Sequence, residues 1–246
     1  MEVHSHSHSH GKKNWRSYFW EFLMLFLAVF CGFLAENQRE HMIEHKREHQ
    51  YMISLLSDLK TDTARLAEVH RFASKQINNY DSLLRLIKNP HYADSIRFLY
   101  YHFLPTTYYD LFNPSRRTID QLEHSGGLRL IRNEKVSDSI TDYYIAAREA
   151  VGQGETWLAY FDQYHEVAFH VFDYSQIDTS FYSREQILTA PHTYTLLKGD
   201  PVEIKLLFNK LFALRFIRFS YMGFLEVANK KAISTLEFLK QEYHLE

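Results

Sequence analysis

The chain has 246 residues, a formal net charge of −2 and a single cysteine, Cys31. This balanced charge gives no basic surface of the kind that binds nucleic acid, and one cysteine excludes an intrachain disulfide or a cysteine-based metal site. Five prolines and eight glycines are few for this length, which indicates long uninterrupted helices. Setting aside one short apolar segment leaves about 200 residues, enough for one domain with its own core.

The first fourteen residues form a tail rich in His and Ser, with the tract HSHSHSH at 4–10. Neutral imidazoles bind Ni, Cu or Zn, but this tract has no folded context that would fix a coordination geometry. Residues 1–14 are therefore predicted to be a disordered cytoplasmic tail, either native or left from expression. No cofactor is predicted for the tail or for the rest of the chain.

Residues 15–36 are predicted to form a transmembrane helix. Their centre, FLMLFLAVFCGFLA at 22–35, carries no charged residue. The stretch 18–35, at about 1.5 Å per residue, reaches roughly 27 Å, close to a hydrocarbon core of about 30 Å. Aromatic residues at the N-terminal end suit the headgroup level, where an apolar ring keeps its polar edge in water.

Three other interpretations of this apolar segment fit less well. A signal peptide needs small residues before its cleavage site, and Phe33 stands where the first of them is expected. A lipid-modified Cys31 needs a small residue before it, where Phe30 stands. A helix lying flat in the interface has two different faces, whereas this segment is apolar all round.

Ala28, Gly32 and Ala35 place small side chains on or beside one face of the transmembrane helix. Small residues let two helices approach closely in lipid, where no hydrophobic force drives them together, so this face predicts a homo-oligomer. The alternative is that small residues are merely tolerated there and that the helix is a simple anchor.

Residues 37–246 are predicted to form a helical bundle domain, entered through a helical stalk at 37–51. His41, His45 and His49 repeat every four residues on this stalk, with glutamates beside them. Two histidines one turn apart can share a zinc ion, so a metal site or a pH sensor is one hypothesis. Solvated histidines, or histidines that line the seam of the bundle, are the simpler alternative.

From position 52 to position 87 the apolar residues alternate by four and three, which gives five heptads of an a/d seam. Leu55, Val69 and Leu83 widen this seam into the broader stripe of a bundle helix. Packing within the domain is therefore favoured over a coiled coil that binds a partner.

The segment 89–133 interrupts the long helices, because Pro90 ends the first of them. Thr118 and Gln121 have the spacing of a capping box, and Gly126 suits a left-handed helix end, so a short helix is predicted between them. A helix, a glycine turn and a second helix suggest DNA binding, but the following face is apolar rather than basic. A corner between bundle helices is predicted instead.

Two further long helices are predicted at 134–172 and 201–243. Asp200 before a proline gives the second of them a clear start signal. Arg215 and Arg218 lie one turn apart in it, among phenylalanines. If they are buried they need acidic partners or an anionic ligand, so they are candidate ligand-binding residues, with internal ion pairs as the alternative.

The predicted fold class is all-α: an N-terminal transmembrane helix continues into a bundle of long helices with short corner helices. No catalytic triad, pair of carboxylates, metal-ligand signature or phosphate loop stands out in the sequence. The protein is therefore predicted not to be an enzyme.

Two segments carry a resemblance: KKNWRSYFWEFLMLFLAVFCGFLAEN and, beyond a long charged helix, FNPSRRTIDQLEHSGGLRLIRNEKVSDSITDYY. They resemble a family of uncharacterised Gram-negative bacterial single-pass membrane proteins, a domain of unknown function with an SGGLRLIRN-type motif. The resemblance extends to about Tyr144 and fades beyond it. It implies one N-terminal span followed by a helical domain, and it brings no activity with it.

Positive charges on the two sides of the span are equal in number, and a long C-terminal domain translocates largely regardless of charge. Together with the resemblance, this predicts an inner-membrane protein with a cytoplasmic N-terminus and a periplasmic C-terminal domain. The predicted function is a membrane-anchored interaction or scaffold protein whose partners are the lipid bilayer, a second copy and an unknown protein. The alternative is a periplasmic sensor or ligand-binding module with an aromatic pocket near Arg215 and Arg218.

Overall fold

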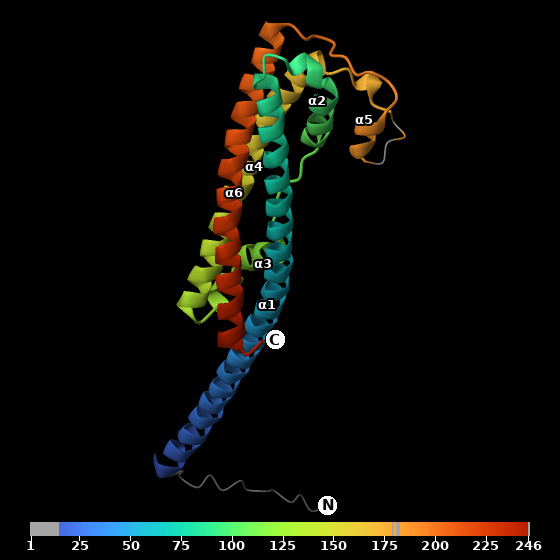
Figure 1. Cartoon of the computed structure of the whole chain (residues 1–246). Coiled ribbons are helices and arrows are strands. Elements are labelled where there is room, and N and C mark those ends of the chain that lie inside the picture. The colour runs from blue at the N-terminus through green and yellow to red at the C-terminus, as the bar shows by residue number, and fades with distance from the viewer. Residues whose placement is uncertain (1–14, 179, 181–182, 246) are drawn as a thin grey trace, which may run out of the picture. The chain divides into compact units, whose positions relative to one another are not determined.

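The computed structural model describes residues 15–178, 180 and 183–245, so the predicted tail at 1–14 lies outside the described residues (Figure 1). As predicted, the described chain is all-α, and its extended structure is limited to one isolated bridge between Phe172 and Leu196. The chain divides into two compact units, Met1–Gln50 and Tyr51–Glu246.

The described part of the first unit is helical throughout and belongs to α1 (Trp15–Lys88), a helix of 74 residues that continues into the second unit. Its sequence explains this length, because α1 contains no proline and Gly32 is its one glycine. The apolar segment and the charged segment after it therefore form one unbroken helix.

The second unit is a bundle of three long helices: the α1 segment 51–88, α4 (Glu134–Val171) and α6 (Pro201–Tyr243), seen side by side in Figure 1. Two of the predicted start signals are present. The Asn133 side chain accepts from the Lys135 N–H at 3.0 Å, and Asp200 Oδ1 accepts from the amides of Val202 and Glu203 at 3.1 and 3.2 Å. These bonds satisfy amides that have no partner within the first turn of a helix.

Short helices connect the long ones. They are the 3₁₀ turns Tyr92–Ser95, Leu104–Thr107, Gly127–Leu130 and Tyr174–Gln176, and the α-helices α2 (Ile96–Phe103), α3 (Arg117–Ser125) and α5 (Glu185–Thr189). Arg97 of α2 donates to the carbonyls of Ile187, Leu188, Ala190 and His192, at 2.7 to 3.2 Å. One guanidinium thereby donates hydrogen bonds to the backbone carbonyls at and just beyond the C-terminal end of α5.

The helix α3 ends as predicted, at Gly126 with a left-handed φ of 66°, but the capping-box prediction for its start is wrong. The N-cap residue is Arg116, whose side chain makes no capping bond, and Thr118 lies inside the first turn. Its amide and hydroxyl are bound instead by Asp58 of α1, a contact between positions sixty residues apart. A capping box inferred from local spacing could not include such a partner.

The core of the second unit has two apolar clusters along the bundle. The first gathers residues from 52–69 of α1, 136–150 of α4 and 221–239 of α6, and the second from 80–87, 157–171 and 204–214 of the same helices. Between them Gly154 faces Tyr221, and a Cβ at position 154 would lie 3.2 Å from the Tyr221 ring. Gly154 is therefore a point of close contact between α4 and α6.

Candidate functional site

The apolar segment of α1 is long and apolar enough to cross a membrane. Its best window has a mean hydropathy of 2.0, and none of that window is buried within the fold. Among the described residues it is the one helix that meets this criterion. An exposed surface of this kind is stable in hydrocarbon and costly in water, so a span near the N-terminus agrees with the fold.

The small-residue face of this helix is also open. Ala28, Gly32 and Ala35 are exposed, and a Cβ built at Gly32 meets no atom within 4 Å. Their role in self-association stays a prediction.

The stalk histidines pair with neighbouring glutamates on the same helix. His41 Nδ1 lies 3.7 Å from Glu44 Oε2, and His45 Nδ1 lies 3.5 Å from Glu48 Oε2. In the part of the chain that the structure describes, no group of three or more His, Cys, Asp or Glu side chains could hold a metal ion. His41, His45 and His49 are therefore not brought together as a metal site.

Arg215 and Arg218 lie one turn apart on α6 but have different surroundings. The Arg215 guanidinium binds Asp81 of α1 through Nε–Oδ1 at 2.5 Å and Nη2–Oδ2 at 3.2 Å, and this two-point contact raises the pKa of Arg215. Arg215 is half-buried, so this is the internal ion pair that the sequence left open as an alternative.

Arg218 is fully buried, with 0% of its surface exposed, and none of its three guanidinium nitrogens has a hydrogen-bond acceptor within the described residues. Its central carbon lies over the Trp157 ring at 4.2 Å, and the Tyr221 and Phe72 rings follow at 5.5 and 5.8 Å. Burial lowers the pKa of Arg218 from its ordinary value. Desolvating such an ion costs several kcal/mol, whereas a desolvated cation–π contact returns about 2 kcal/mol.

A groove runs between α1 and α6 beside Arg215. Its volume is about 660 Å³, and we call it the α1–α6 groove. Its charged and aromatic lining residues are Asp81, Arg85, Lys88, Phe208, Phe212 and Arg215. A second cavity, of about 350 Å³, shares Lys88 and Phe208 with the groove and adds Lys205 and apolar residues. Among the described residues, four cations thus line the two cavities, and the one carboxylate there, Asp81, is bound to Arg215.

Phenylalanines continue from this groove along the outer face of α6. Phe212, Phe216 and Phe219 are 55%, 63% and 64% exposed, and the Phe208 and Phe212 rings stack with centroids 6.3 Å apart. Their spacing of three or four residues places them on one side of the helix. We call these four residues the phenylalanine stripe. Exposed aromatic side chains gathered in this way are typical of an interaction surface.

Another cavity shares the lining residue Asn78 with the groove. Its volume is about 550 Å³, and we call it the Phe72 pocket. Its main lining residues are Phe72, Lys75, Gln76, Pro105, Tyr108 and Arg184. No aspartate or glutamate among the described residues lines it, but Arg184 is bound by Asn79 Oδ1 at 2.6 Å and lies 3.5 Å from Glu185 Oε1.

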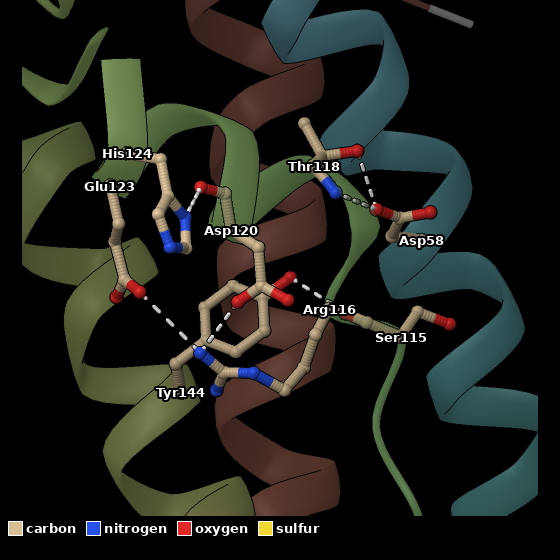
Figure 2. A network of polar contacts seen from close by, with 8 residues as sticks. All are labelled: Asp58, Ser115, Arg116, Thr118, Asp120, Glu123, His124 and Tyr144. Atoms are coloured by element: carbon tan, nitrogen blue, oxygen red, sulfur yellow. Dashed lines mark hydrogen bonds and ion pairs between the residues drawn. The ribbon is translucent and has the colours of Figure 1, made fainter. Parts of the chain in front are cut away.

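A network of polar side chains joins the segment 115–124, which precedes the SGGLRLIRN motif, to α1 and α4, and Figure 2 shows its residues around α3. Asp58 Oδ2 accepts from the Thr118 amide at 3.2 Å and from its hydroxyl at 2.5 Å. Arg116 donates to Asp120 and Glu123, and the Tyr144 hydroxyl donates to the Ser115 carbonyl. One turn along α1 from Asp58, Asp62 accepts from the Ser115 amide at 2.8 Å and from the Tyr143 hydroxyl.

The contacts of this network account for its residues structurally, and none of them requires a catalytic role. Burial raises the pKa of both the Tyr143 and the Tyr144 hydroxyls, so they are protonated donors at neutral pH. Each buried polar group in it meets a partner, which is the pattern of a structural network. This network is therefore a clamp that joins α3 to α1 and α4.

Sequence reasoning missed Asp58 and Asp62, although a signal for the second was present. Positions 55, 62, 69, 76 and 83 follow one another every seven residues and are all buried. The two polar members of this row, Asp62 and Gln76, are both bound to distant residues. A polar residue in an otherwise apolar heptad position indicates a buried hydrogen bond.

Comparisons of this chain with protein-family models, with curated proteins and with solved structures gave no match.

Proposed function

We propose that this protein is a membrane-anchored, non-catalytic interaction protein that binds an acidic segment of a partner protein in the α1–α6 groove and along the phenylalanine stripe. Residues 15–36 anchor it in the inner membrane, with the N-terminus cytoplasmic and the bundle periplasmic, as the resemblance implies. The observation that carries the proposal is the exposed stripe that joins a cationic groove.

The stripe supplies the apolar part of binding. Phe212, Phe216 and Phe219 leave more than half of each side chain in water, and covering them removes that apolar surface from solvent. Aromatic side chains are also the type most often found at the energetic centre of an interface.

Charge decides which partner fits. Arg85, Lys88 and Lys205 are exposed, and Arg215 lines the groove beside its bound carboxylate. A partner with aspartates or glutamates beside an apolar face matches this arrangement, and a basic partner is repelled. An amphipathic acidic helix fits both the stripe and the groove, because its apolar face can pack against the phenylalanines while its acidic side chains contact the cations.

The test is a photo-crosslinker in place of Phe216 in the full-length protein in cells. We expect an adduct to a peptide of another protein, with acidic residues beside apolar ones at helical spacing. Arg85→Glu together with Lys88→Glu should abolish the adduct, whereas Lys230→Glu, on α6 beyond the phenylalanine stripe, should not. No adduct, an adduct to lipid alone, an adduct to a second copy alone, or an adduct insensitive to charge reversal would overturn the proposal.

A second function, ligand sensing by the bundle, is favoured by one specific observation. Arg218 is a buried cation without a hydrogen-bond acceptor among the described residues, and its contacts are with the Trp157, Tyr221 and Phe72 rings. A buried cation balanced only by aromatic rings is uncommon outside functional sites, because the rings return less free energy than desolvation costs.

A further inference from the structure

The α1–α6 groove adjoins the smaller cavity of about 350 Å³, which lies between the end of α1 and the start of α6. Figure 1 shows these two helix ends at the same end of the bundle. We call this cavity the Pro90 pocket. Its apolar and aromatic lining residues are Ile87, Pro90, Tyr92, Pro201, Ile204 and Phe208. Walls of this kind suit an apolar group rather than a charged one.

The floor of the Pro90 pocket is fixed by the fold. Ile87 and Ile204 are 6% and 5% exposed and belong to the second apolar cluster of the core. The Tyr92 hydroxyl donates to the Gly199 carbonyl at 2.5 Å and joins the loop after α1 to the loop before α6. The pocket is therefore formed before a partner arrives, so an occupant pays no cost for opening it.

Three cations lie around this pocket and the adjoining end of the groove: Arg85, Lys88 and Lys205. All three are exposed, and none of them has an ion pair within the described residues. No carboxylate among the described residues lines the pocket. An apolar group that enters the pocket is therefore favoured when acidic residues accompany it.

The phenylalanine stripe sets the length of an occupant that also reaches this pocket. Phe208 lines both the pocket and the groove, and its ring stacks on Phe212 with centroids 6.3 Å apart. From Ile204 to Phe219, α6 rises by roughly 22 Å at about 1.5 Å per residue. A partner helix that covers the stripe and reaches the pocket is therefore about fifteen residues long.

We infer that the Pro90 pocket takes one bulky apolar side chain, an aromatic ring or a leucine, from one end of the acidic partner helix. The acidic residues of that helix lie within about two turns of this anchor, opposite the three cations, and its apolar face follows the stripe. A single side chain buried in a pocket often carries a large share of the binding energy of an interface. The inference rests on the proposed partner binding and adds to it the sequence signature of the partner.

The test is a second photo-crosslinker in the full-length protein in cells, in place of Pro201, beside the one in place of Phe216. Pro201 is exposed at the first position of α6, and its replacement leaves the Asp200 cap in place. We expect both positions to give adducts to the same segment of the same partner. The residue crosslinked from position 201 should be bulky and apolar. It should lie about 8–12 residues from the one crosslinked from position 216, because Ile204 and Phe208 of the pocket precede Phe216 by those intervals and both helices have the same rise.

Filling the pocket should exclude the anchor. Asn89→Trp places a large ring there from an exposed lining position, and Ile204→Trp does so from the floor. Each should lower the yield of the Phe216 adduct by about tenfold. Val202→Trp is the matched control and should leave the yield unchanged, because Val202 is 76% exposed in the first turn of α6 and does not line the pocket.

The outcomes separate this inference from the proposed function. An adduct from position 216 with none from position 201 would overturn the anchor and leave partner binding in the groove standing. A polar residue crosslinked from position 201, or equal yields for Asn89→Trp and Val202→Trp, would do the same. Asn89→Trp decides the matter if Ile204→Trp does not fold, since Asn89 is exposed. No adduct from either position would overturn both proposals.

Discussion

Replacing Asp58 by alanine tests whether the start of α3 is held to α1 by the polar clamp. Asp58 is buried on α1 and accepts from the Thr118 amide at 3.2 Å and from the Thr118 hydroxyl at 2.5 Å. It also accepts from Arg117 Nη2 at 3.4 Å. Asp58→Ala removes all three contacts and leaves two polar groups of a buried threonine without a partner.

The expected loss follows from those two groups. A buried donor left without an acceptor costs about 1–3 kcal/mol, so the Thr118 amide and hydroxyl together cost about 3 kcal/mol. The Arg117 contact adds little, because its side chain is largely in solvent. For a domain of this size, one kcal/mol corresponds to about 2–4 °C in the melting temperature, so Asp58→Ala should lower it by roughly 6–12 °C.

The assay is thermal unfolding of the full-length protein in detergent, followed by far-UV circular dichroism and, in a Trp15→Phe/Trp20→Phe background, by Trp157 fluorescence. Asp58→Asn keeps an acceptor and should lose about 1 kcal/mol. Asp142→Ala is the control, because Asp142 makes an exposed ion pair with Lys231 and should change stability by less than about 1 kcal/mol. A melting temperature for Asp58→Ala equal to that of the control would refute the clamp.

Four further predictions are open to direct measurement. Arg97→Met should lower the free energy of local unfolding of α5 by about 2 kcal/mol, which corresponds to roughly thirtyfold faster amide exchange at 185–189. Unchanged exchange at these residues would show that Arg97 does not hold α5. Burial lowers the pKa of His165, so its neutral form favours folding, and this stability is lost as pH falls through the unfolded pKa of about 6.5. His165→Phe should therefore make the melting temperature fall less steeply on acidification. An equally steep fall in the variant and in the wild type would show that His165 does not cause it. Gly32→Ile should shift a crosslinked dimer toward monomer with the bundle still folded; an unchanged oligomer distribution would leave the span as an anchor only. Alkaline phosphatase fused to the C-terminus should be active, and an inactive fusion beside an active cytoplasmic reporter would reverse the topology.

The sequence by itself determined the helices of this protein. Heptad spacing, a missing helix breaker between positions 15 and 88, and the cap at Asp200 are local signals, and the structure places α1 and α6 accordingly. These signals work because helix formation depends on residues within one or two turns. The capping box at Thr118 failed for the same reason, since its true partner, Asp58, is distant in sequence.

Tertiary structure alone decided what the polar residues of those helices do. Arg215 and Arg218 lie one turn apart in nearly the same local sequence, yet Asp81 binds the first, whereas the second is enclosed by aromatic rings. Spacing along a helix fixes the direction in which a side chain points, but the groups it meets come from other helices. Whether a charge is paired or left to attract a ligand is therefore settled only when the bundle closes around it.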